Sequence, residues 1–287
     1  MTQFERNIYS VHLHTLGLEL GEGLHWDKNR GLVWCVDILN KKLLSIDINN
    51  GQIKNFKFDD LISWVITRDK YMSLMIGVKD RICSYMPEKN KLETIVKVET
   101  NNPNIRLNDA KIDSKGNIWF GTMNYIDPKK KEGKFFCLKE KTLSLIDDGY
   151  NITNGPAINK RKNYLLHNDS YKRIIYKYEN IGDTENIKKT IWKKFGAAYG
   201  SPDGMCFDRD ENLWLAHWGA GIVTKTNIHG KELLKIPIPT PYVTNVCFVG
   251  ERLDRLIVST ARNESNLPLA GDLFEIIGHG TAGIDCE

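Results

Sequence analysis

A short pattern recurs six times along the chain: an apolar segment, a polar turn, and a second apolar segment that often contains Trp. Two of the copies read NDAKIDSKGNIWFGT and DGMCFDRDENLWLAHW. The residues that open the six turns are Asp27, Asp69, Asp113, Asn159, Asp208 and Val249, at steps of 42, 44, 46, 49 and 41 residues. Two short apolar segments joined by a polar turn are typical of a β-hairpin. The pattern therefore predicts a repeated hairpin unit of about 45 residues.

This spacing is typical of one four-stranded blade of a β-propeller. Six such units account for nearly all of the 287 residues. We therefore predict an all-β fold, a six-bladed β-propeller that forms a single domain over residues 1–287. The strand near residues 10–16 is expected to complete a blade with strands near 256–259 and 273–277. The alternative, a two-domain α/β chain, would need amphipathic helices and a glycine-rich phosphate loop, and neither is visible in the sequence.

Charge and cysteine content exclude several classes of protein. The 40 basic and 36 acidic side chains give a net charge of +4 that is spread along the chain, so we expect no nucleic-acid partner. No run of 18 apolar residues and no signal-like amino terminus is present, so we expect no membrane partner. The six cysteines are scattered without a C-x-x-C pair and are expected to be free thiols. These observations predict a cytoplasmic protein, and we expect a monomer.

Polar residues recur at one position of the repeat, five residues before each turn. These positions hold Glu22, Trp64, Asn108, Asn154, Asp203 and Thr244. Because equivalent positions of a propeller form a ring around its axis, four carboxylate or amide side chains are expected to converge there. Converging buried anions are costly without a counter-charge, so the ring predicts a metal site on the central axis for one divalent ion. Oxygen ligands suit Ca²⁺ or Mg²⁺ and tolerate Mn²⁺, Fe²⁺ or Zn²⁺, so the identity of the ion stays open.

The alternative for these residues is structural, since Asn and Asp often bond backbone groups at turns. We prefer the metal site because four equivalent positions share the same chemistry. Arg106 lies two residues before Asn108 and on an extended strand shares its face, so it is expected to hold a substrate oxygen. The alternative for Arg106 is a salt bridge at the surface or between blades. Trp64 occupies a ring position and is expected to form an apolar wall of the pocket.

Several stretches, in order, resemble the senescence marker protein, gluconolactonase and luciferin-regenerating enzyme family, which includes regucalcin. They are LGEGLHWD, RLNDAKIDSKGNIWFGTM, ITNGPAIN, HNDS and SPDGMCFDRDENLWLAHWGAG. The resemblance spans nearly the whole chain. It implies a six-bladed propeller with a divalent metal held on the axis by Glu22, Asn154 and Asp203. It also implies that Arg106 and Asn108 of the RLND motif contact the substrate.

The family is best known for hydrolysing sugar lactones, so the resemblance implies that a small sugar lactone is the substrate and that an aldonic acid is the product. A metal would polarise the lactone carbonyl. Asp203 is then expected to be the catalytic residue, either as general base on water or by direct nucleophilic attack. Arg106 and Asn108 would orient the substrate.

One position departs from the family pattern. Some members contact the sugar through a Glu shortly after the GTM motif, where Ile126 stands in this chain. Asn124, Tyr125 or Asp127 could replace that Glu, or the substrate could differ in its hydroxyl pattern. Two alternatives to a lactonase therefore stay open: an esterase or phosphotriester hydrolase of the same fold, and a non-catalytic calcium-binding regulatory protein.

Overall fold

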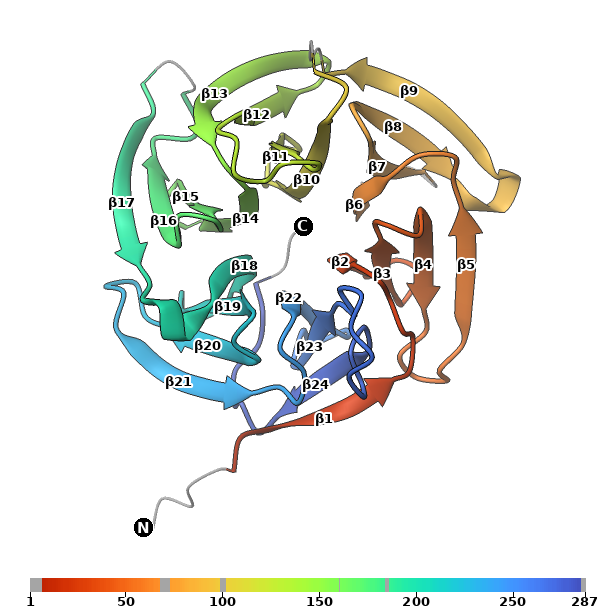
Figure 1. Cartoon of the computed structure of the whole chain (residues 1–287), viewed down its shortest axis with the longest axis vertical. Helices are drawn as coiled ribbons and strands as arrows, with labels where there is room; N and C mark the ends of the chain where they lie inside the picture. The colour runs from red at the N-terminus through yellow and green to blue at the C-terminus, as the bar shows by residue number, and fades with distance from the viewer. Residues whose placement is uncertain (1–6, 68–72, 99–101, 160, 184–185, 285–287) are drawn as a thin grey trace.

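The computed structural model describes residues 7–67, 73–98, 102–159, 161–183 and 186–284. Six antiparallel sheets of four strands each surround a central axis (Figure 1). The predicted all-β, six-bladed β-propeller is confirmed. Among the described residues, no helix is long and apolar enough to cross a membrane.

Each of the first five blades is built from four consecutive strands. Blade one contains β2 (Gly21–Asp27), β3 (Leu32–Asp37), β4 (Lys42–Ile46) and β5 (Ile53–Lys57). Blade two contains β6 (Ile62–Thr67), β7 (Leu74–Val78), β8 (Arg81–Met86) and β9 (Lys91–Lys97). Blade three contains β10 (Ile105–Ile112), β11 (Ile118–Asn124), β12 (Gly133–Lys139) and β13 (Thr142–Tyr150). Blade four contains β14 (Thr153–Asn159), β15 (Tyr164–Asp169), β16 (Ile174–Glu179) and β17 (Lys188–Lys194). Blade five contains β18 (Ser201–Phe207), β19 (Leu213–Trp218), β20 (Ile222–Thr226) and β21 (Glu232–Pro237).

The sixth blade closes the ring with strands from both parts of the chain. It contains β22 (Val243–Val249), β23 (Arg255–Thr260), β24 (Leu273–Ile277) and β1 (Tyr9–His14). β1 pairs with β24 in antiparallel register, as predicted from the sequence. This pairing joins the beginning of the chain to its last strand and closes the circle of blades, which limits exposed sheet edges.

Burial between neighbouring blades holds the ring together. Among the described residues, six buried apolar clusters are present, one between each pair of adjacent blades. Trp34, Trp119 and Trp214 belong to three of them, as expected for packing between blades. Each indole Nε1 donates a hydrogen bond to the Asp that opens its hairpin turn, at 3.0 or 3.1 Å. The repeated Asp and Trp of the sequence therefore form one structural unit in blades one, three and five.

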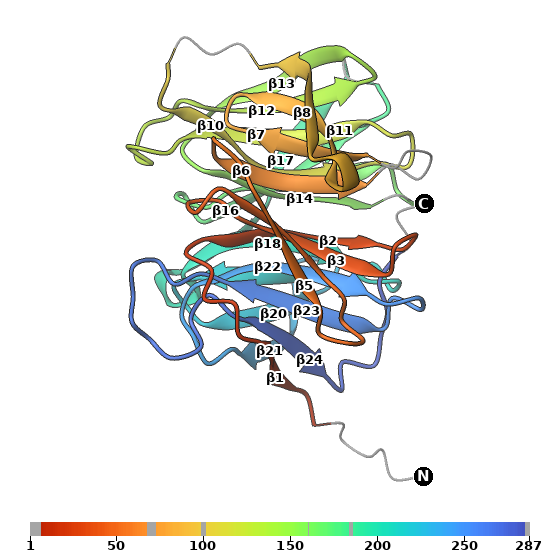
Figure 2. The ribbon, with the colours of Figure 1, turned by 90° about the vertical axis from the view of Figure 1, so that its right-hand side faces the viewer.

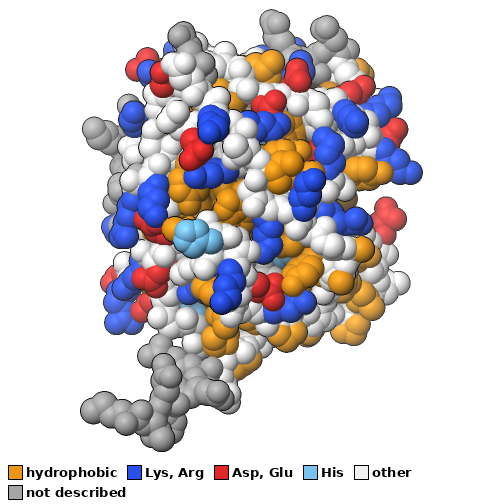
Figure 3. Space-filling view, turned by 90° about the vertical axis from the view of Figure 1, so that its left-hand side faces the viewer, with side chains coloured by type: hydrophobic (Ala, Val, Ile, Leu, Met, Phe, Trp, Pro, Cys, Tyr) orange, Lys and Arg blue, Asp and Glu red, His pale blue; other side chains and the backbone are white. Residues whose placement is uncertain are grey.

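The outer strands of the blades face solvent. The pattern is clearest in β17, where only Ile191 is apolar among the first four residues and all four are exposed. Figure 3 shows the side of the propeller that carries this strand: basic and acidic side chains are interspersed there with apolar ones. The first strand of each blade lies nearest the axis (Figure 1), and the side view shows the twist of the sheets (Figure 2). The first strands therefore position any axial site.

Candidate active site

Every first strand carries a β-bulge next to the predicted ring. The register with the second strand shifts between Glu22 and His25, Ile62 and Trp64, Leu107 and Ala110, Asn154 and Ala157, Pro202 and Met205, and Val243 and Asn245. A bulge inserts one extra residue and leaves a backbone N–H outside the ladder. Near the bulges, four polar side chains accept a hydrogen bond from the backbone N–H of the next residue in the sequence. They are Glu22, Asp109, Asn154 and Asn245, at 3.2, 2.7, 2.9 and 2.9 Å.

The backbone conformation beside the ring requires glycine at two positions. Gly23 and Gly155 follow Glu22 and Asn154 and have φ values of +60° and +56°. A Cβ on Gly23 would also lie 3.1 Å from Cα of Trp64 in the next blade. Only glycine adopts this conformation without strain. Gly23 of the GEG segment and Gly155 of the TNG segment therefore allow the left-handed backbone conformation that follows Glu22 and Asn154.

The five predicted site residues come together in one buried group. The Asn154 amide donates to the Asp203 carboxylate from the neighbouring blade. Arg106 donates to Asn108 Oδ1 at 2.6 Å, and Asn108 Nδ2 donates to the carbonyl oxygen of Thr153 at 2.6 Å. Glu22, Asn154, Asp203, Arg106 and Asn108 are between 4% and 7% exposed. Their convergence agrees with the ring expected from the sequence, while their roles stay predictions.

Burial and like charge act together on the carboxylates. Burial, strengthened by the Asp109 carboxylate, raises the pKa of Glu22 to about 8. Burial and then the Glu22 and Asp109 carboxylates raise the pKa of Asp203 well above its ordinary value. Burial lowers the pKa of Arg106 to about 10, although Glu22 and Asp203 oppose this change. In their ionised forms, the carboxylates of the group would carry more negative charge than its single guanidinium compensates.

Two polar residues near this group were missed by the sequence reasoning. Asp109 is 3% exposed, and its Oδ2 is buried without a hydrogen-bond partner among the described residues. Asn245 Nδ2 donates to Glu22 Oε2 at 3.3 Å. Asp109 directly follows Asn108 in the RLND motif, and Asn245 directly follows the expected ring position 244. A ring built by uniform spacing overlooked both because a bulge shifts which residue faces the axis.

The two remaining ring positions hold side chains that serve the packing of the blades. Trp64 is 1% exposed and belongs to the cluster between blades two and three, where its ring centroid lies 6.4 Å from that of Phe120. Thr244 donates to the carbonyl oxygen of Gly21 and contacts the Ser259 hydroxyl at 2.8 Å. Trp64 therefore packs in the core between blades, which differs from the expected pocket wall.

The position that departs from the family pattern lies on the surface. Ile126, in the loop after β11, is 64% exposed. The Asn124 side chain is hydrogen-bonded within this loop. Its Nδ2 donates to Glu132 at 2.6 Å, and its Oδ1 accepts from the backbone N–H groups of Ile126 and Asp127. The Tyr125 ring lies under the Lys79 ammonium at 3.8 Å. Of the three expected replacements for the sugar-contacting Glu, Asn124 thus already has a structural role.

The chemistry of the donor set decides whether a divalent ion fits. Within the described ranges, no group of three or more His, Cys, Asp or Glu side chains is arranged to hold a metal. The predicted set is of another kind, with two carboxylates and one amide. Its oxygen atoms, its buried excess of negative charge and the unpartnered Asp109 Oδ2 suit a hard cation. The residues fit such an ion, and the metal itself stays a prediction.

The sequence of the chain also matches a known protein family. The model of the SMP-30/Gluconolactonase/LRE-like region matches residues 20–262. The chain belongs to this family. The match includes all six first strands and therefore every residue of the buried group described above.

Individual relatives of this SMP-30/gluconolactonase/LRE-like chain cover nearly its whole length. YvrE of Bacillus subtilis, named for sugar lactone lactonase activity, is 29% identical over 267 residues, which is 89% of this chain and 90% of YvrE. Regucalcin of Gallus gallus is 27% identical over 296 residues, or 96% of this chain and 97% of the relative. The solved structure of a luciferin-regenerating enzyme superposes with a TM-score of 0.91 at 27% identity, covering 97% of this chain and 98% of the enzyme.

Proposed function

We propose that this protein is a divalent-metal-dependent hydrolase that opens a small sugar lactone to the aldonic acid. The observation that carries the proposal is the buried group in which the Glu22 and Asp203 carboxylates, the Asn154 amide and the Arg106 guanidinium meet. The name of the YvrE relative supports a sugar lactone as the substrate class. A carboxylic ester hydrolase needs a base, donors for the substrate oxygens and compensation for the charge that develops, and this group offers all three.

Glu22, Asn154 and Asp203 would hold the ion. When bound, a divalent ion supplies a Lewis acid for the carbonyl oxygen and a counter-charge for the two carboxylates. Ca, Zn, Mn, Mg and Fe ions are all compatible with these oxygen donors. Asp109 Oδ2 is buried beside the group and has no hydrogen-bond partner among the described residues, so a nearby cation would also favour the ionised form of this carboxyl.

Asp203 is proposed as the catalytic residue. As a general base, its carboxylate accepts a proton from the attacking water as the water oxygen bonds to the lactone carbonyl carbon; the ring oxygen then leaves and takes up a proton. The alternative is direct attack by the carboxylate on the same carbon, followed by hydrolysis of the acyl intermediate. Both routes require ionised Asp203, and the counter-charge of a cation favours that form.

Arg106 and Asn108 are proposed to bind the substrate. Arg106 Nη1 donates to Asn108 Oδ1 at 2.6 Å and to the carbonyl oxygen of Leu107 at 2.8 Å, and these two bonds fix the orientation of its guanidinium. A planar guanidinium held in this way has further N–H groups that can donate to ring or hydroxyl oxygens of a lactone. Charge-assisted donors of this kind orient a substrate more strongly than neutral ones.

The experiment is hydrolysis of a panel of pentono- and hexonolactones by metal-stripped protein. Single divalent ions are added back, and spontaneous ring opening is subtracted. An aryl ester and a phosphotriester are measured in parallel. Metal-dependent turnover of a lactone that exceeds turnover of both other substrates is the expected result. Faster turnover of the ester or phosphotriester would favour the other hydrolase, and metal binding without any turnover would favour a regulatory protein.

A further inference from the structure

The carbonyl oxygen before each polar ring residue accepts a side-chain hydrogen bond from the neighbouring blade. The four ring residues are Asn108, Asn154, Asp203 and Glu22, and the carbonyls before them belong to Leu107, Thr153, Pro202 and Gly21. The donors, in the same order, are the side chains of Ser63, Asn108, Ser170 and Thr244, at distances between 2.5 and 2.7 Å. All four donors are at most 6% exposed. Each bond therefore crosses a buried interface between blades and ends one residue before a polar ring side chain.

The two ring positions without a carboxylate or amide lack this bond. Trp64 and Thr244 occupy them, and the carbonyl oxygens before them belong to Ser63 and Val243. In the part of the chain that the structure describes, no side chain donates to either oxygen. A β-bulge is present in all six first strands, so the bulge alone does not explain the difference. The bonds occur where the ring side chain is a carboxylate or an amide, and not at every repeat.

The HNDS segment, residues 167–170, supplies the donors to blade five. The Ser170 hydroxyl donates to the carbonyl oxygen of Pro202 at 2.7 Å. Asn168 Nδ2 donates to the carbonyl oxygen of Asp203 itself at 2.9 Å. Blade four therefore holds the peptide units on both sides of the Asp203 Cα atom.

The geometry of the peptide bond explains why such a bond sets the position of the next side chain. A bulge disrupts the ladder and bends the strand, so the register with the second strand fixes the ring residues less firmly there. The carbonyl of one residue and the N and Cα atoms of the next lie in one rigid plane. A hydrogen bond to that carbonyl therefore restrains the Cα atom from which the ring side chain projects.

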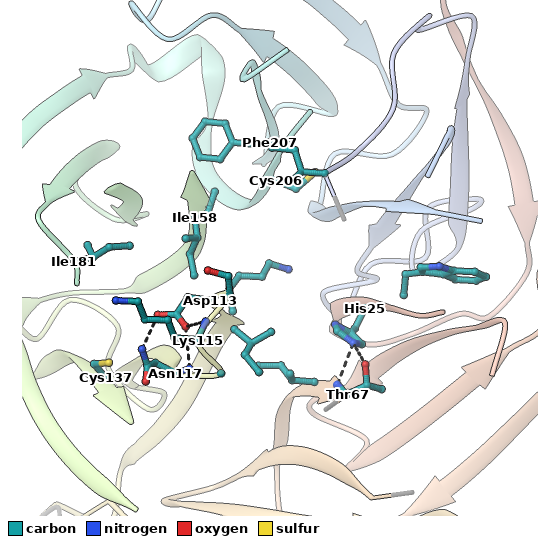
Figure 4. Close-up of a pocket in the computed structure, with 18 of the residues that line it drawn as sticks. His25, Thr67, Asp113, Lys115, Asn117, Cys137, Ile158, Ile181, Cys206 and Phe207 are labelled. Atoms are coloured by element: carbon teal, nitrogen blue, oxygen red, sulfur yellow. Dashed lines mark hydrogen bonds between the residues drawn. The ribbon is translucent and has the colours of Figure 1, made fainter. Parts of the chain in front are cut away.

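The opposite end of the first strands is arranged differently. A cavity of about 1150 Å³ lies there, and none of the five predicted site residues lines it. Figure 4 shows that the Asp113 carboxylate accepts hydrogen bonds from Lys115 and Asn117 of its own turn. The bond between blades in the same view joins His25 to Thr67, with His25 Nε2 as the acceptor from the Thr67 backbone N–H. The bonds to carbonyls at the ring thus have no counterpart among the residues labelled in Figure 4.

We propose that Ser63, Ser170 and Thr244 are positioning residues of the candidate active site. Each hydroxyl restrains the peptide unit before one ring residue in the neighbouring blade and so sets the position of that side chain. The ring residues that they serve are Asn108, Asp203 and Glu22, respectively. The inference rests on the proposed function for the roles of these ring residues, whereas the hydrogen bonds that support it do not depend on that function.

Removing one hydroxyl at a time tests the proposal, with a hexonolactone as substrate and Mn²⁺ as the ion. Ser170→Ala should lower kcat about tenfold at saturating metal with KM within about twofold, because it displaces the proposed base. Ser63→Ala should raise KM about fivefold and leave kcat unchanged, because it displaces a proposed substrate-binding amide. Thr244→Val should weaken Mn²⁺ binding about tenfold by calorimetry, because it displaces a proposed metal ligand. A merely structural role would not separate kcat, KM and metal affinity in this way.

Thr260→Val is the matched control. Like Thr244, Thr260 lies buried in blade six and donates through its hydroxyl to a backbone carbonyl oxygen, that of Asp272 at 2.7 Å, but no ring residue follows that carbonyl. The control should lower the Tm about as much as Thr244→Val and should leave kcat, KM and the affinity for Mn²⁺ unchanged. Thr244→Ser keeps the hydroxyl and should restore the affinity for Mn²⁺ to within about threefold of the wild type.

Crystal structures of the metal-free variants give a result that needs no reaction. In Ser170→Ala the Asp203 carboxylate should lose its hydrogen bond with the Asn154 amide, whereas Thr260→Val should keep it. A wild type that hydrolyses no lactone would contradict the proposed function, and these structures would still decide whether the hydroxyl positions Asp203.

Three results would each overturn the inference. They are unchanged kinetics and metal affinity in all three hydroxyl variants, the same losses in these variants as in Thr260→Val, and an unmoved Asp203 carboxylate in Ser170→Ala. The three hydroxyls act on different blades, so a variant that does not fold leaves the other two to decide.

Discussion

Two aspartates of blade five, five residues apart on the same stretch of chain, have opposite surroundings. Asp208 accepts hydrogen bonds from the N–H groups of Asp210 and Asn212 and from Trp214 Nε1, and pairs with Lys225 at 2.8 Å. Asp203 faces the buried Glu22 carboxylate, a like charge, with the Asn154 amide as its side-chain donor. Both are less than 5% exposed. The first carboxylate has complete partners for its charge, whereas the second lacks a cationic partner of its own among the described residues.

The same contrast recurs in other blades. Asp27 and Asp113 bond the turn and the indole of their own blade, as Asp208 does. Burial raises the pKa of both Glu22 and Asp109, on the same two first strands; the Asp109 carboxylate adds to this effect at Glu22, while the Lys111 ammonium opposes it at Asp109. The acids that open the hairpin turns thus recur with complete hydrogen-bond partners, whereas the acids of the buried group have incomplete compensation for their charge. Buried charges without compensation are costly and are typical of functional sites.

The largest effect is expected for Asp203→Asn. The variant keeps the size of the side chain and removes both the base and one like charge. We expect lactone hydrolysis to fall by about 10³-fold or more, measured as kcat at saturating metal, with an unchanged or higher Tm. Activity close to that of the wild type would show that Asp203 has no catalytic role and is a structural residue, as Asp208 is.

Asp208→Asn is the matched variant and should have the opposite outcome. The substitution leaves the Lys225 ammonium without its partner and places an amide against the Trp214 indole N–H. We expect a loss of about 3 kcal/mol in the free energy of unfolding, measured by urea denaturation, with kcat retained in the molecules that stay folded. A stable variant with reduced kcat would contradict the structural role.

Glu22→Gln should weaken the affinity for the divalent ion about 100-fold by calorimetry. It should also change how stability depends on pH. In the metal-free wild type the folded pKa of Glu22 is about 8 against an ordinary value of 4.5, so between about pH 5 and 8 the folded state keeps a proton that the unfolded state has lost. Stability from this group therefore falls as pH rises, and the variant should lack this fall. Identical pH profiles of Tm would argue against a raised pKa.

Arg106→Ala should raise the KM for a lactone about tenfold and leave the metal affinity within about threefold. The physical reason is the loss of charge-assisted donors to substrate oxygens, since Arg106 contacts Asn108 and the backbone of Leu107. Steady-state kinetics with calorimetry of the same sample separates the two quantities. Unchanged kinetics would place Arg106 with the structural residues of the comparison.

The smallest effect is expected for Asp109→Asn. One carboxylate fewer relieves repulsion on Glu22 and Asp203, so the metal-free protein should gain about 1 kcal/mol in the free energy of unfolding. The affinity for a divalent ion should fall about fivefold, because the negative potential is reduced. Calorimetric unfolding with and without metal measures both. A lower stability of the metal-free variant would mean that Asp109 is a structural acid.

The sequence predicted the fold because its information is local and repeated. Hairpin turns opened by Asp27, Asp113 and Asp208 can be recognised within about ten residues, and the spacing of the copies gives the number of blades. The sixth blade could also be predicted, since a closed ring leaves β1 no other partner than β24. Four residues of the buried axial group were predicted in the same way, from equivalent positions of the repeat, and Arg106 from its register with Asn108.

What the sequence alone determined is therefore the count of blades, the recurring hairpin of each blade and five of the polar residues of the buried group, namely Glu22, Arg106, Asn108, Asn154 and Asp203. Only the tertiary structure decided that Asn245 reaches Glu22 while Thr244 binds the neighbouring blade, and that Asp109 is buried without a partner for Oδ2 among the described residues. A bulge of one residue reverses which side chain faces the axis, and its position is not visible in the spacing of the copies.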